Sequence, residues 1–211
     1  MSTATPVKRR RGRPPKQLEG NSETREALVR SGVEILTEKG FSAAGLDEIL
    51  KKVSVPKGSF YHYFDSKEAF GHELIAHYDQ FFARKLDSFL LNEDLKPLDR
   101  IQAFVDDAAA SMQRFDFRRG CLVGNLGQEM STLPESYREL LKQVFEHWQG
   151  KFETCLKLAK ETGYLSPQTD CKQLALTFWI GWEGAVLRSK LEQSPEPLHI
   201  FATFFLSNLR N

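Results

Sequence analysis

A segment between residues 56 and 68 carries side chains suited to contacts with nucleic acid. If Phe60 and Phe64 point inward from a short helix, a polar set of side chains must emerge on the other side. This outward set combines one cation with short or planar hydrogen-bonding groups: Lys57, Ser59, Tyr61 and His62. Gly58, at the helix N-terminus beside Lys57, permits close approach of a phosphate. Such groups can bond to base edges and phosphates in a major groove, and Lys67 can contact the flanking backbone.

A second chemically distinctive segment runs from Phe117 to Glu129. Two arginines precede Cys121, and a positive charge near a thiol lowers its pKa toward a reactive thiolate. Glycines in the same segment allow the backbone to approach a small ligand, and aromatic and charged residues farther along the chain can complete a site. The candidate ligand-binding or sensing residues are Cys121, Arg118, Asn125, Gln128, Trp179, Trp182, Glu183 and Lys190.

Several of these assignments have alternatives that the sequence leaves open. Cys121 can be a sensor, a pocket wall without chemistry, or a small buried core residue. Trp179 and Trp182 divide in the same way between core and ligand wall, whereas Cys155 and Cys171 are expected to be packing residues. The histidines show no spacing typical of metal ligands, so we expect no metal and no cofactor.

The elements that must position these residues are all predicted to be helical. Apolar residues recur with helical spacing, and no segment shows the sustained alternation of a strand. Helices are predicted over residues 21–39, 44–53, 56–64, 66–91, 97–115, 134–162, 170–192 and 197–209, with an irregular segment at 118–130. The predicted fold is all-α. It has a flexible basic arm (1–20), a three-helix helix-turn-helix domain (21–66) and a larger helical regulatory and dimerisation domain (67–211).

Composition and charge limit the class of protein. The 211-residue chain is 41% hydrophobic and 27% charged, which excludes collagen-like, low-complexity and wholly disordered classes. No apolar run is long enough to span a bilayer, and no signal peptide is evident, so we expect no membrane partner and a reducing cytoplasm. Residues 1–66 hold 12 Lys/Arg against 8 Asp/Glu, whereas the remainder holds 17 against 20. Only the N-terminal third is therefore expected to bind a polyanion.

The basic arm is expected to contribute to binding double-stranded DNA. Its core, Arg11-Gly12-Arg13-Pro14, looks like an AT-hook, in which a narrow Arg-Gly-Arg segment lies in an A·T-rich minor groove. Two alternatives remain open: a solvated tail that adds only nonspecific, salt-sensitive attraction, and a nuclear localisation signal.

The string from Lys57 to Glu68 resembles the recognition-helix signature of the TetR (tetracycline repressor-like) family of transcription regulators. The resemblance covers roughly residues 22–70. It implies a phosphate contact from Lys67 and base or phosphate contacts from Lys57, Ser59, Tyr61, His62 and Tyr63. The sequence departs from the family pattern at Ala44, which removes a capping threonine, at Ser54, which replaces a turn glycine, and at Pro56, which replaces a serine cap.

The same resemblance implies a homodimer whose helical domain binds a small-molecule effector. The last two helices are predicted to form the dimer interface, because they hold more apolar surface than one small domain needs. The residues expected there are Leu174, Phe178, Gly181, Gly184, Ala185, Phe201, Phe204, Phe205 and Leu209. A looser similarity, at Gly120-Cys121-Leu122 and Glu196-Pro197-Leu198, is to the family branch that answers acrylate and other reactive electrophiles.

These observations favour a repressor that a small acrylate-like carboxylate or electrophile releases from a palindromic operator. A redox or thiol sensor acting through Cys121 and a nonspecific architectural DNA-binding protein are the alternatives. An enzyme is not expected, because Cys121 and a helical histidine such as His147 lack an identifiable third group or oxyanion hole.

Overall fold

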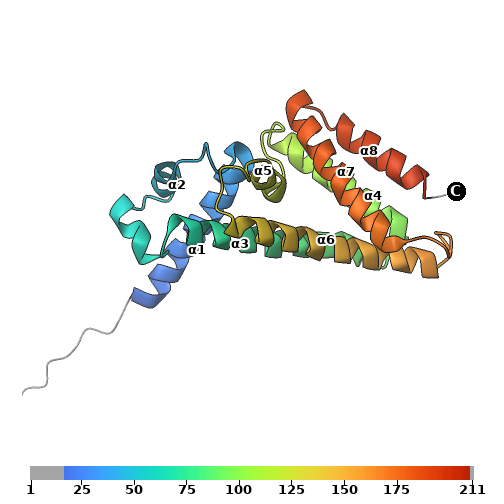
Figure 1. Ribbon diagram of the computed structural model, residues 1–211, viewed down its shortest axis with the longest axis horizontal. Coiled ribbons are helices and arrows are strands. Elements are labelled where there is room, and N and C mark those ends of the chain that lie inside the picture. The colour runs from blue at the N-terminus through green and yellow to red at the C-terminus, as the bar shows by residue number, and fades with distance from the viewer. Residues whose placement is uncertain (1–16, 210–211) are drawn as a thin grey trace, which may run out of the picture.

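The computed structural model describes residues 17–209, and within this range the chain is helical and contains no β-strand (Figure 1). In chain order the elements are α1 Gln17–Lys39, α2 Leu46–Lys52, the 3₁₀ helix η1 Lys57–His62, α3 Lys67–Leu90, α4 Pro97–Arg114, α5 Leu122–Gln128, α6 Ser136–Glu161, α7 Cys171–Glu192 and α8 Glu196–Ser207. This architecture confirms the predicted all-α class. Arg11 and Arg13 of the basic arm lie outside the described residues.

Several helix boundaries follow local sequence signals. The side chain of Ser66 accepts a hydrogen bond from the amide of Ala69 at 2.9 Å and caps the N-terminus of α3. Pro97 lies in the first turn of α4, where its missing N–H costs nothing. Gly163 has a φ of +81° directly after α6, a left-handed conformation that commonly ends helices. The boundaries predicted from these residues are confirmed.

The start of the first helix was placed too late. The helix α1 begins at Gln17, so residues 17–20 are helical rather than part of a flexible arm. Gln17, Leu18 and Glu19 are good helix formers, so the low apolar content of residues 1–20 as a whole does not mark where the helix begins.

The predicted third helix is a 3₁₀ helix rather than an α-helix. In η1 the amide of Ser59 bonds to the carbonyl of Pro56, and that of Tyr63 bonds to Phe60, both at 2.9 Å. Gly58 and the aromatic residues that follow it are weak helix formers, and short segments of this kind often wind into the tighter 3₁₀ form.

The segment predicted to be irregular contains the helix α5. The side chain of Cys121 accepts a hydrogen bond from the amide of Gly124 at 3.4 Å and caps this helix. Leu122, Val123 and Leu126 are buried against neighbouring helices, and such packing can stabilise a short helix despite its glycines.

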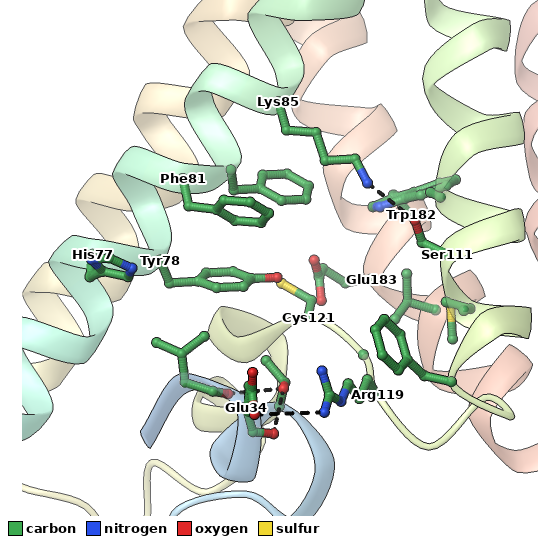
Figure 2. A pocket seen from close by; sticks show the side chains of 18 of the residues that line it. Glu34, His77, Tyr78, Phe81, Lys85, Ser111, Arg119, Cys121, Trp182 and Glu183 are labelled. Atoms are coloured by element: carbon green, nitrogen blue, oxygen red, sulfur yellow. Dashed lines mark hydrogen bonds and ion pairs between the residues drawn. The ribbon is translucent and has the colours of Figure 1, made fainter. Parts of the chain in front are cut away.

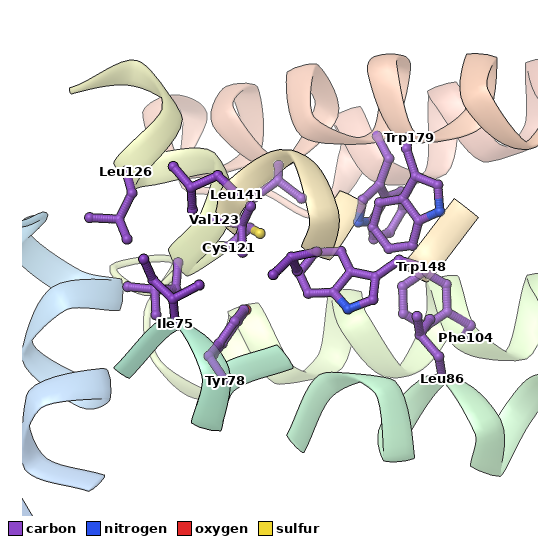
Figure 3. Packing of buried hydrophobic residues seen from close by; sticks show 14 of the residues in the cluster. Ile75, Tyr78, Leu86, Phe104, Cys121, Val123, Leu126, Leu141, Trp148 and Trp179 are labelled. Carbon is purple, nitrogen blue, oxygen red and sulfur yellow. The ribbon is translucent and has the colours of Figure 1, made fainter. Parts of the chain in front are cut away.

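The core of the regulatory half is rich in aromatic side chains. The long helix α3 leads away from the N-terminal elements beside α6, and α4, α7 and α8 pack at the other end of the molecule (Figure 1). Trp148 and Trp179 (Figure 3) have ring centroids 5.1 Å apart. Phe152 and Phe178 stack with centroids 4.2 Å apart. Trp179 is therefore a core residue, which settles one alternative that the sequence left open.

Candidate DNA interface and effector pocket

The recognition segment, residues 56–67, presents a polar surface held by two buried aromatic anchors. Phe60 is 0% exposed and Phe64 is 4% exposed, and both contact the ring of Phe70 at the start of α3. Tyr61, between the anchors, is 66% exposed, and His62 next to it is also exposed. The predicted inward and outward orientations are confirmed, while the DNA contacts themselves stay a prediction.

The remaining residues of this segment differ in how freely they can reach DNA. Lys57 and Gly58 are exposed, and Lys57 forms an ion pair with Asp47 of α2 at 2.9 Å. Ser59 and Tyr63 are half-buried, and Tyr63 packs partly against the core. Lys67 is exposed, and its ammonium group lies 4.7 Å from the centre of the Phe41 ring in the turn between α1 and α2.

Two departures from the family pattern have structural consequences. Ser54 has a φ of +59°, a left-handed conformation that favours glycine, as expected for the turn between α2 and η1. Ala44 is buried, so its small side chain is part of the packing of the domain.

A cavity of about 460 Å³ lies in the regulatory half, between α1, α3, α4, α7 and the loop before α5 (Figure 2). Aromatic and apolar side chains make up most of its wall: Val33, Tyr78, Phe81, Phe82, Phe104, Ala108, Met112, Phe115, Trp182 and Val186. Cys121, in the loop before α5, and Glu183, on α7, both point into the cavity beside the hydroxyl of Tyr78. An apolar cavity with a few convergent polar groups is the usual form of a small-molecule site.

The expected reactive thiolate at Cys121 is not supported by its surroundings. Burial raises the pKa of the Cys121 thiol well above its ordinary value, and the nearby carboxyl of Glu183 raises it further. The two arginines that were expected to lower it face acidic residues of α1 instead. Arg118 lies 3.6 Å from Glu38, and Arg119 lies 4.0 Å from Glu34. The prediction of a lowered pKa is therefore wrong.

Only part of the predicted ligand set lines the cavity. Cys121, Trp182 and Glu183 do, whereas Arg118, Asn125, Gln128, Trp179 and Lys190 do not. Gln128 is exposed, and Lys190 donates to the side-chain oxygen of Asn125 at 3.4 Å.

Sequence reasoning missed the wall contributed by α3 and α4. Tyr78, Phe81 and Phe82 are aromatic residues spaced by three and four positions on α3. Phe104 and Met112 of α4 line the same cavity. The aromatic cluster of α3 was a usable signal, but aromatic residues at helical spacing also describe any helical core.

Comparison with known proteins identifies the chain. Residues 28–74 match the family described as bacterial regulatory proteins, tetR family, and residues 97–205 match the tetracyclin repressor-like C-terminal domain. The chain belongs to the TetR family. Transcriptional regulator AcuR of Cereibacter sphaeroides is 51% identical over 202 residues, which cover 96% of this chain and 92% of AcuR.

Further similarities support this assignment. The transcriptional repressor NemR of Escherichia coli (strain K12) is 32% identical over 83% of this chain and 88% of NemR. A crystal structure described as regulatory protein TetR from Rhodobacter sphaeroides has a TM-score of 0.85 and 51% identity. The structural match covers 88% of this chain and 98% of the chain in that crystal structure. As a TetR-family regulator, the chain binds double-stranded DNA, acts as a homodimer and responds to a small-molecule effector.

Among the helices of residues 17–209, none is both long and apolar enough to cross a membrane. The same part of the chain holds no group of three side chains arranged to bind a metal ion.

The outer face of α7 and α8 is suited to the homodimer that the family forms. Ile180 and Phe204 are each 70% exposed. Together they belong to an apolar face, here called the dimer face, which consists of Leu176, Ile180, Leu187 and Leu191 on α7 and Ile200 and Phe204 on α8.

The predicted interface residues were only partly right. Phe204 is on the dimer face, but Phe178, Ala185 and Phe205 are buried within the protomer. Gly181 faces the ring of Phe201 on its own α8, so its small size serves packing inside one subunit. Gly184 has open space around it and lies on the exposed side of α7.

The loop that contains Gly120 and Cys121, together with the helix α5 that follows it, connects the cavity to the DNA-binding half. The amide of Gly120 donates to the carbonyl of Thr37 at 3.2 Å, and the side-chain amide of Asn125 donates to the same carbonyl at 2.9 Å. At the other end of α5, the carboxylate of Glu129 accepts hydrogen bonds from the amides of Phe41 and Ser42 at 3.0 and 2.7 Å. A displacement of α5 must therefore move the end of α1 and the turn that leads to α2.

Replacing Glu129 with glutamine is expected to weaken operator binding roughly tenfold, or about 1.4 kcal/mol. Glutamine keeps only one acceptor oxygen and no charge, so one of the two charge-assisted bonds to the turn is lost. Fluorescence anisotropy with labelled operator DNA measures the change. Glu135→Gln, which removes an exposed carboxylate paired with Arg138 on α6, is the matched control. Equal affinities for the two variants would show that the Glu129 contact does not hold the DNA-binding domain in place.

Proposed function

We propose that this protein is a transcriptional repressor whose dimer leaves its operator when a small α,β-unsaturated carboxyl compound enters the cavity beside Cys121. The observation that carries the proposal is the position of Cys121. Its side chain lines the cavity and also caps α5, the helix hydrogen-bonded to the DNA-binding half. A ligand that displaces this cap acts directly on the connecting helix.

The chemistry of the cavity supports this class of effector. Its walls are largely aromatic, which suits the carbon skeleton of a small unsaturated compound. Cations also border it: Arg30 and Arg119 near α1, and Lys85 from α3. These charges favour a carboxylate end group. The similar protein NemR is named a repressor, which supports the same direction of control.

Release from DNA follows from the geometry of two recognition segments in a dimer. Two half-sites in successive major grooves are separated by about 34 Å, and this spacing is fixed by the duplex. An effector that binds more tightly to a conformer with displaced α5 and α1 shifts the population away from the spacing that fits DNA. Only this difference in affinity between the two conformers can drive the release.

The experiment is a gel shift with the DNA upstream of the protein's own gene, with acrylate and its neutral methyl ester as probes. We expect a retarded band that either compound removes, with release by methyl acrylate accompanied by a mass increase of the intact protein at Cys121. The Cys121→Ser variant should still give the retarded band after treatment with methyl acrylate, and its mass should not increase. A band that persists at saturating concentrations of both compounds would show that the effector belongs to another class.

A further inference from the structure

The carboxyl group of Glu183 is buried in the effector cavity without a full set of partners. Its oxygen Oε1 is buried and has no hydrogen-bond partner among the described residues. The other oxygen lies against the backbone of α5 at Gly124, where a methyl group would overlap it. Figure 2 shows this carboxyl pointing toward the sulfur of Cys121 and the hydroxyl of Tyr78. An unpaired buried carboxyl oxygen is costly, and such groups often mark functional sites.

The protonation states around Glu183 leave the thiol without thiolate character. Burial raises the pKa of Glu183 to about 7, so its carboxylate and carboxylic acid forms coexist near neutral pH. The pKa values of Cys121 and Tyr78 are both raised well above their ordinary values by burial. Because the thiolate is the nucleophilic form, covalent capture of an electrophile here requires a neighbouring proton acceptor.

We propose that Glu183 is that acceptor and takes the thiol proton of Cys121 as the sulfur adds to an α,β-unsaturated carbonyl compound. This inference rests on the function proposed above and assigns a chemical role to Glu183, a residue of the effector cavity. The sequence alone made Glu183 a candidate ligand-binding or sensing residue but assigned it no chemical role.

The addition is balanced without any further reactant. The S–H proton of Cys121 passes to the Glu183 carboxylate while the sulfur electron pair forms a bond to the β-carbon. The π electrons of the C=C bond move toward the carbonyl group and give an enolate. The Glu183 carboxylic acid then returns its proton to the α-carbon, and the product is a thioether. Tyr78 stays protonated and can donate a hydrogen bond to the developing enolate oxygen.

Two of the cations that border the cavity also pair with carboxylates. Lys85 of α3 pairs with Asp107 of α4, and Arg119 faces Glu34 of α1. The titratable and charged residues that line the cavity with Glu183 are Arg30, Glu34, His77, Tyr78, Lys85, Arg119 and Cys121. Of these, Figure 2 shows the sulfur of Cys121 and the hydroxyl of Tyr78 beside the Glu183 carboxyl.

The test is the rate of adduct formation at Cys121 with methyl acrylate, followed by intact mass between pH 5.5 and 9. For the unmodified sequence we expect the rate to be half-maximal near pH 7, where Glu183 loses its proton, and to level off by about pH 8. Glu183→Gln is expected to slow the reaction about 100-fold at pH 7.5 and to abolish this levelling. Glu192→Gln, an exposed residue on the same helix, should match the unmodified protein.

A purely electrostatic role for Glu183 predicts a change of opposite sign. Removing a negative charge next to Cys121 lowers the thiol pKa, so Glu183→Gln would then react faster. A faster or unchanged rate overturns the proposal. So does a rate in the unmodified protein that keeps rising tenfold per pH unit up to pH 9, which is the behaviour of an unassisted thiol with a raised pKa.

Failure of this inference can be told apart from failure of the proposed function. If methyl acrylate labels Cys121 and releases DNA equally well in both proteins, the effector assignment holds and the role of Glu183 is wrong. If neither acrylate nor its ester releases the operator, the proposed effector class is wrong. Circular dichroism melting of Glu183→Gln checks the fold. The pH profile of the unmodified protein tests the proposal even if that variant is unstable.

Discussion

Replacing Ile180 with glutamate is expected to convert the dimer into a monomer and to weaken operator binding by roughly 100-fold or more. Ile180 belongs to the dimer face on α7 and is 70% exposed in the protomer. In a twofold interface the same residue occurs once in each subunit, so the substitution places two carboxylates in the apolar contact. Loss of pairing removes the second half-site contact, whose contribution to avidity is of order 10² to 10⁴.

Analytical ultracentrifugation measures the oligomeric state, and fluorescence anisotropy measures operator affinity. Leu91→Glu is the matched control, because Leu91 is an exposed apolar residue that follows α3 and lies outside α7 and α8. It should remain dimeric and bind DNA normally. If Ile180→Glu also sediments as a dimer, the homodimer uses another surface.

The fold could be predicted where the determining signals are local. Ser66, Pro97 and Gly163 each end or begin a helix through the conformation of a few neighbouring residues, and each boundary was predicted correctly. The recognition segment was also accessible to sequence reasoning. The spacing of Phe60 and Phe64 by four positions places both anchors on one face and so fixes the exposed side.

The electrostatics of the effector cavity could not be predicted, because they depend on contacts between distant parts of the chain. Adjacent arginines suggested an activated Cys121, but the charges that reach Arg118 and Arg119 come from α1, some 80 residues earlier. The residue that most affects the thiol, Glu183, lies about 60 positions later on α7. The residues adjacent to Cys121 in the sequence give no information about either of these long-range contacts.

The dimer face shows how composition can be right and residue assignment wrong. The apolar excess of the last two helices was noted correctly, but Phe178 is buried and Ile180, two residues later, is exposed. Consecutive helical residues are separated by about 100°, so two such positions lie on nearly opposite faces. When both faces of a helix are apolar, only the packing of its neighbours decides which one is left for a partner.

Replacing Tyr61 with alanine is expected to weaken binding to the operator about 100-fold while leaving the protein folded and dimeric. Tyr61 is 66% exposed between two buried anchors, so its side chain contributes little to the core. A lost direct contact to a base costs about 1 to 3 kcal/mol, and the dimer loses two of them. Because a tyrosine contact neutralises no phosphate, the dependence of affinity on salt concentration should not change.

The measurement is a salt titration of operator affinity for Tyr61→Ala beside Tyr164→Ala. Tyr164 is an exposed tyrosine in the loop after α6, remote in sequence from the recognition segment, and its loss should not alter binding. Discrimination between operator and unrelated DNA should also shrink for Tyr61→Ala, because nonspecific binding depends mainly on phosphate contacts. A variant that binds both DNAs as the unmodified protein does would show that Tyr61, although it faces outward, does not read the groove. The polar surface of the recognition segment would then act through its other exposed residues, such as Lys57 and His62.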